Sequence, residues 1–137
     1  MVVSSEELLF ENRSYAVPQI RIQRMVKKGE LIPLKRGMYE TDSTAPGFLM
    51  ANAILGPSYI SFEYALSYHS MIPERVITYT SATFGRNKKI EFSNSFGTFT
   101  YRDIPQAVFP YFYSREFHGN RPYLIASREK ALCDQLY

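Results

Sequence analysis

The spacing of apolar residues changes along this chain of 137 residues, and the change separates a helical part from a sheet part. Apart from a predicted hairpin at residues 29–40, the apolar residues up to Pro73 recur at helical intervals, whereas from Arg75 onward they alternate with a period of two. Strands are predicted over residues 76–80, 89–92, 96–101, 111–117 and 123–126, with turns at 85–87 and 93–94. Ten of the 21 aromatic residues fall between Phe92 and Tyr123, as expected for a sheet packed on helices. We therefore predict an α+β protein with a mostly antiparallel sheet.

The N-terminal segment is predicted to form two helices. Ser4 caps a short helix that extends through Phe10. Pro18 opens a second helix, which runs to Lys28 and is stopped by Gly29. The predicted buried face of this second helix consists of Pro18, Ile22, Met25 and Val26.

A predicted hairpin follows in the sequence GELIPLKRGMYE, residues 29–40. Its short strands cover residues 31–34 and 38–40, and its bend contains Lys35 and Arg36. A basic helix followed by a hairpin with a basic tip is the arrangement of a winged helix-turn-helix. We place this module at residues 1–42. Turn-forming residues 41–47 predict a linker, and residues 47–137 a second, α+β domain.

The second domain is predicted to contain three helices. The first covers residues 48–55, and the second follows Ser61 and ends by Pro73. Ser127 caps the last helix, from Arg128 to the end of the sequence. Because helical spacing continues there without a stop signal, we expect the domain to be incomplete.

Positive charge is concentrated in one segment. Residues 13–36 hold seven basic residues and one acid, which gives +6, and the whole chain carries +3, so the rest carries −3. Such asymmetry points to a polyanionic partner, because phosphate neutralisation dominates non-specific binding to nucleic acids. A solvated basic helix face is the alternative explanation of the same charges.

Enzymatic motifs are weak in this sequence. Ser127 and Lys130 match the S-x-x-K of penicillin-binding enzymes, but the companion motifs are missing, so Ser127 is interpreted as a helix cap. His69 and His118 lack partners at metal-ligand spacing, and Cys133 is interpreted as a buried structural thiol. The possible nuclease carboxylates lie on different elements: Glu63, Asp103, Glu116 and Glu129. We predict no enzyme, no metal and no cofactor.

The compartment is predicted to be the cytoplasm. A single cysteine cannot form an internal disulfide, and no apolar run approaches the roughly 20 residues of a membrane span. The first nine residues contain Glu6 and Glu7 and no basic segment, unlike a signal peptide. We therefore expect a soluble, intracellular protein with no membrane partner.

Four segments together resemble the AbiEi-type antitoxins of bacterial abortive-infection, or type IV, toxin–antitoxin systems. They are GELIPLKRGMYE at 29–40, GPSYISFEYALSYHSMIPERV at 56–76, FGTFTYRDIP at 96–105 and YLIASREKALCDQLY at 123–137. The resemblance implies an N-terminal winged helix-turn-helix and a C-terminal antitoxin domain, of which this chain carries a part. It also implies a transcriptional autorepressor that binds double-stranded operator DNA and counters a nucleotidyltransferase toxin without a stable complex.

The resemblance places DNA contacts on the basic helix and on the tip of the hairpin. The implied DNA-binding residues are Gln19, Arg21, Gln23, Arg24, Lys27, Lys28, Lys35 and Arg36. Gln23 and Arg24 face away from the predicted buried stripe and suit base edges, whereas the lysines and Arg36 suit phosphates. Only 17 residues precede Pro18, which leaves room for one of the two supporting helices that a full module usually has.

A second hypothesis concerns a different class of function. The chain is then a protein-interaction module that binds a partner through its aromatic-rich sheet, and the basic helix is merely solvated. Salt dependence separates the two hypotheses, because DNA binding weakens steeply with salt and an aromatic interface does not.

Overall fold

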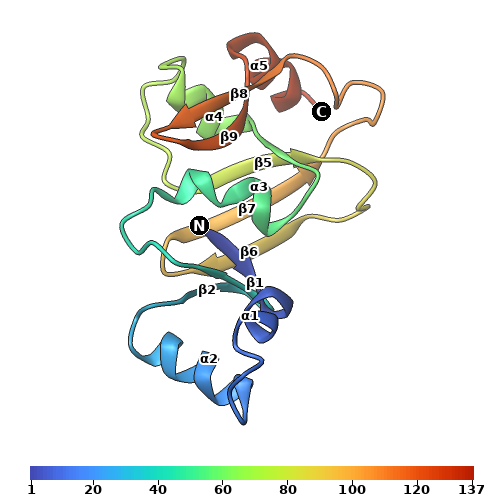
Figure 1. The fold of residues 1–137 in the computed structure, drawn as a ribbon. Coiled ribbons are helices and arrows are strands. Elements are labelled where there is room, and N and C mark those ends of the chain that lie inside the picture. The colour runs from blue at the N-terminus through green and yellow to red at the C-terminus, as the bar shows by residue number, and fades with distance from the viewer. The chain divides into compact units, whose positions relative to one another are not determined.

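The structure is a computed structural model that describes all residues from Met1 to Tyr137. The chain is an α+β protein, and it divides into two compact units (Figure 1). Unit 1 comprises residues 1–45 and 93–95, and unit 2 comprises residues 46–92 and 96–137. The longest helix has ten residues, and none of the helices has the length and apolar character needed to cross a bilayer.

Unit 1 contains two helices and a three-stranded antiparallel sheet. The elements are β1 (Val2–Ser4), α1 (Ser5–Glu11), α2 (Pro18–Lys27), β2 (Ile32–Lys35) and β3 (Met38–Glu40). The strand order is β1-β3-β2, so the first strand pairs with the last. The predicted helices and hairpin are present within one or two residues, whereas β1 was not predicted.

Local signals fix the ends of both helices in unit 1. The Ser4 hydroxyl accepts a hydrogen bond of 3.2 Å from the Glu7 amide, which caps α1. Pro18 occupies the first turn of α2. Gly29 ends it with a φ of +81°, which a residue with a side chain rarely adopts. Each of these ends lies where the sequence predicts it.

The core of unit 1 lies between the helices and the sheet. Its buried members are Val3, Leu8, Ile22 and Leu31, against which Met25, Val26 and Tyr39 are partly buried. The predicted buried face of α2 is therefore confirmed, with Ile22 at its centre. Because Ile22 points into the core, the opposite side of α2 faces solvent.

Unit 2 is built around a six-stranded sheet. Its strands are β4 (Tyr59–Ile60), β5 (Tyr79–Thr83), β6 (Ile90–Asn94), β7 (Gly97–Asp103), β8 (Tyr113–His118) and β9 (Arg121–Ala126). The strand order is β6-β7-β5-β4-β9-β8. The pairs β5–β7 and β4–β9 are parallel, whereas β4–β5 and β8–β9 are antiparallel. The sheet is thus mixed. The chain crosses over between β5 and β7 and between β4 and β9, whereas the sequence pattern alone suggests successive hairpins.

The helical part of unit 2 is more broken than predicted. The expected helix over 48–55 is a 3₁₀ turn, η1 (Gly47–Leu49), and one α-helical turn, α3 (Ala51–Ile54). The next helix, α4 (Phe62–Tyr68), ends before Pro73, since Ser70 has a φ of +59° and the Met71 amide donates to the Leu66 carbonyl at 2.8 Å. This 6→1 bond around a left-handed residue is a Schellman motif, which terminates a helix without proline.

The last helix, α5 (Arg128–Gln135), follows β9 and packs against α4 (Figure 1). Ser127 caps it as predicted, because its hydroxyl accepts a 3.1 Å hydrogen bond from the Lys130 amide. Cys133 on this helix is exposed, so the prediction of a buried thiol is wrong. The buried positions of α5 are Lys130, Ala131 and Asp134 instead, because a polar pair occupies part of the inward face.

Candidate nucleic-acid interface

The predicted contact residues of α2 lie mainly on its solvent side. Gln19, Gln23, Arg24 and Lys27 are exposed along the helix, and Lys28, which follows its last turn, is exposed as well. None of the ten residues of α2 is acidic. This face therefore presents cations and amides with no carboxylate among them.

The cations of this face are not neutralised by neighbouring acids. Arg24, Lys27, Lys28 and Arg36 form no ion pair in the structure. Arg24 and Lys27 lie in the last turn of α2, where the negative end of the helix dipole favours positive charge. These cations are therefore available to bind an external anion.

The hairpin brings two further basic residues next to α2. Gln23, Val26, Lys35, Arg36 and Gly37 line one hollow of about 400 Å³ between the helix and the hairpin bend. Lys35 ends β2 and pairs in register with Met38, and Gly37 supplies the positive φ of +80° that the tight bend requires. The structure therefore joins predicted contact residues from both elements on one surface.

Arg21 differs from the other predicted contact residues. It is half-buried, and its guanidinium carbon lies 5.4 Å from the centre of the Tyr15 ring. Its Nε atom is buried and has no hydrogen-bond partner. Arg21 thus covers Tyr15 at the start of α2, and only part of its guanidinium faces solvent.

A second hollow of about 290 Å³ lies at the N-terminal end of α2. It is lined by Tyr15, Ala16, Val17, Ile20, Arg21 and Arg24. The sequence analysis assigned no role to Tyr15, Val17 or Ile20. The signal for them is that Tyr15 and Val17, just before α2, and Ile20, outside its buried stripe, are bulky apolar side chains at the start of a basic helix.

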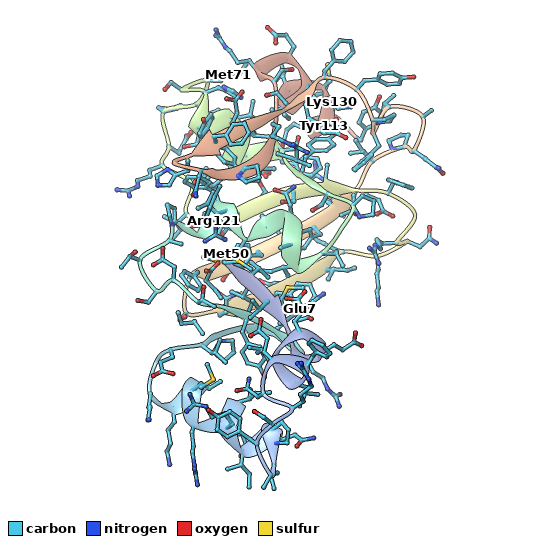
Figure 2. All side chains as sticks on the ribbon, viewed as in Figure 1. Glu7, Met50, Met71, Tyr113, Arg121 and Lys130 are labelled. Atoms are coloured by element: carbon cyan, nitrogen blue, oxygen red, sulfur yellow. The ribbon has the colours of Figure 1, made fainter.

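The residues weighed as enzymatic in the sequence hold structural positions. Lys130 Nζ donates to the Val108 carbonyl at 2.5 Å and lies 3.2 Å from Asp134 Oδ1. His69 Nε2 is 2.8 Å from the Ala126 carbonyl oxygen, and the His118 ring contacts Phe48. Figure 2 shows Lys130 and Tyr113 near each other beside α5, and both lie against the Tyr59 ring.

The four carboxylates weighed as a nuclease site form no common cluster in the structure, and three of them have hydrogen-bond partners of their own. Glu63 accepts a hydrogen bond from Gln135, Glu116 accepts one from Ser114, and Asp103 accepts one from Thr83. The structure contains no group of three or more His, Cys, Asp or Glu residues placed to hold a metal ion.

An apolar hollow of about 520 Å³ lies in unit 2, between α5 and the loop before β8. It is lined mainly by Val108, Tyr111, Phe112, Cys133 and Tyr137. Of these residues, Phe112 has the most exposed apolar side chain, at 76%. This surface favours a protein-interaction module, but it lies on α5 and the loop before β8 and not on the aromatic-rich sheet that the sequence hypothesis names.

Comparison with known proteins identifies no family for this chain. No protein-family model matches the chain, and no curated protein matches it at a significant level.

Proposed function

We propose that this protein is a DNA-binding antitoxin and transcriptional autorepressor of a type IV toxin–antitoxin operon. Its unit 1 acts as a winged helix-turn-helix, with α2 as the recognition helix and the β2–β3 hairpin as the wing. The protein counters a nucleotidyltransferase toxin without forming a stable complex with it, and it works in the cytoplasm as a non-enzyme.

One observation carries the DNA-binding part of this proposal. The solvent side of α2 and the adjoining hairpin bend present Arg24, Lys27, Lys28 and Arg36 without ion pairs, next to Gln23. A helix of ten residues with a basic, acid-free face fits the major groove, and a basic wing fits the phosphates beside it.

The order of elements in unit 1 is a second support. A strand precedes α1, the hairpin follows α2, and the first strand pairs with β3 in a three-stranded sheet. Residues 12–17 connect the two helices, which pack on each other. In this arrangement the buried side of α2 packs on the core of unit 1, and its basic side faces solvent.

The test measures binding of the purified chain to the DNA upstream of its own reading frame. We expect binding whose logarithmic affinity falls linearly with the logarithm of salt concentration, because cations displace counterions from phosphates. An unrelated duplex of equal length and composition is the control for sequence preference. Binding that salt does not weaken, or no binding at all, contradicts the proposal.

The antitoxin part is tested separately in cells. Co-expression with a nucleotidyltransferase encoded beside the gene should restore growth, and pull-down of one protein should not recover the other. Growth arrest that the chain fails to relieve contradicts this part and leaves the DNA-binding test unaffected.

The second candidate function is a protein-interaction module. The apolar hollow lined by Val108, Tyr111 and Phe112 favours it. In this case Phe112→Ser removes binding to the partner, and charge removal on α2 has no effect.

A further inference from the structure

Three apolar side chains interrupt the basic surface at the start of α2. Tyr15, Val17 and Ile20 have exposed fractions of 51%, 47% and 44%. Single exposed apolar residues are ordinary on protein surfaces, but these three line one hollow together with Arg21 and Arg24. A ligand that fits this patch has an apolar group with negatively charged groups on either side of it.

The residues around this patch are positively charged, which favours an anionic partner. Arg21 and Arg24 border it, Lys27 and Lys28 follow along the helix, and α2 has no acid in its first turn. The positive end of the helix dipole lies at the same place and also favours an anion. A second protein surface that buries Val17 and Ile20 has to supply acids for these cations, whereas a DNA groove supplies phosphates on both sides.

Ile20 lies near the N-terminus of α2. Residues in the N-terminal part of a recognition helix contact base edges, and Ile20 is the third residue of α2. Ile20 and Arg24 are one turn apart, so both side chains lie on one face of α2. The apolar feature that a base edge offers in the major groove is the 5-methyl group of thymine.

We propose that Val17 and Ile20 read thymine through its 5-methyl group, beside the base contact of Arg24. The inference rests on the proposed function, since it assigns a base preference to the same DNA-binding surface. Tyr15 lines the same hollow, and its ring lies under the Arg21 guanidinium.

The experiment compares thymine with uracil in otherwise identical duplexes. Duplexes that bind the wild-type chain are enriched from a random-sequence pool and amplified with either dTTP or dUTP. Uracil keeps every hydrogen-bonding group of thymine and lacks only the methyl group. We expect affinity for the uracil pool to be about three- to fourfold lower for each methyl group that the protein covers.

Alanine variants test whether Val17 and Ile20 cause the difference in affinity between the two pools. Ile20→Ala and Val17→Ala should bind the thymine pool more weakly, and their ratio of thymine to uracil affinity should approach one. Ile77→Ala, the same substitution at a 77% exposed position in unit 2, should leave the ratio unchanged. Circular dichroism of each variant checks that α2 is still formed.

The outcomes separate this inference from the function on which it rests. Wild-type binding that is equal for the two pools overturns the thymine contact and leaves DNA binding intact. A ratio that persists in both alanine variants overturns the assignment to Val17 and Ile20. Failure of the wild-type chain to bind any duplex overturns the proposed function and the inference together.

Discussion

Lys130 Nζ lies 3.2 Å from Asp134 Oδ1, and both side chains are buried in unit 2. The other carboxylate oxygen of Asp134 accepts hydrogen bonds from the Tyr59 hydroxyl at 2.8 Å and from the Ser61 hydroxyl at 2.7 Å. Asp134 therefore links α5 to β4 through Tyr59 and to the N-terminus of α4 through Ser61. Together with the capping role of Ser127, this gives the S-x-x-K pattern of the sequence a structural explanation.

Removing one member of this buried pair should strongly destabilise unit 2. Asp134→Ala leaves the Lys130 ammonium without its counter-charge, and we expect a loss of about 3–5 kcal/mol in the free energy of unfolding. Urea denaturation measures it, with Glu129→Ala, an exposed acid on the same helix, as the control. A double variant, Lys130→Met with Asp134→Leu, should lose less than Asp134→Ala, and equal losses would contradict the role of the pair.

Alkaline pH should unfold unit 2 through its buried tyrosines. Burial raises the pKa of Tyr64 to about 12 from its ordinary value of 10, with smaller contributions from Tyr79 and Tyr68. Burial also raises the pKa values of Tyr59, Tyr101 and Tyr123. Since the unfolded chain releases these protons near pH 10 and the folded chain holds them, stability should fall as the pH rises above 10.

The measurement for this prediction is ultraviolet absorbance of tyrosinate, followed together with circular dichroism. Part of the tyrosinate signal should appear only as the helical signal is lost. Complete ionisation of all tyrosines with the fold intact would contradict the assignment of these groups as buried.

Limited proteolysis should first cut the chain between the two units. Residues 41–44 are exposed, whereas Ala45 and Gly47 are buried, so we expect cleavage within 42–44. The space beside Gly47 is occupied by the Tyr79 ring, which holds the start of unit 2. Mass spectrometry identifies the first fragments. Early cleavage inside either unit, with this segment intact, would argue against a junction here.

The helices of this fold could largely be predicted because their signals are local. Ser4, Pro18, Gly29 and Ser127 define helix ends within a few residues of sequence, and each does so in the structure. The strands β1 and β4 could not be predicted in this way. They have three and two residues, too few for a period, and they exist because distant segments pair with them.

The candidate interface was predictable to a similar extent. Helical spacing around Ile22 indicates which side of α2 faces solvent, so Gln23 and Arg24 could be placed outward from the sequence. The hollow that joins Gln23 to Lys35 and Arg36 depends on how α2 packs beside the hairpin, which no local pattern encodes. The role of these residues in binding DNA stays a prediction.

Arg24 and the wing residues should differ in what they contribute to DNA binding. Arg24→Ala should cost about 1–3 kcal/mol on the operator and relax the preference at one base pair. Lys35→Ala or Arg36→Ala should weaken binding to all sequences alike and reduce the salt slope by about one. Fluorescence anisotropy on the operator and on single-base variants distinguishes the two patterns. The same behaviour from all three variants would contradict the division of roles.

The most direct test of DNA binding by unit 1 removes its charge and leaves its fold. The variant Arg24→Gln, Lys27→Gln, Lys35→Gln, Arg36→Gln changes three exposed side chains and the half-buried Lys35, and it spares Ile22 and the core around it. Its circular dichroism should match that of the wild-type chain. Its affinity for the DNA upstream of its own reading frame should fall to an undetectable level at moderate salt. A folded variant that still binds this DNA with wild-type affinity would contradict the account.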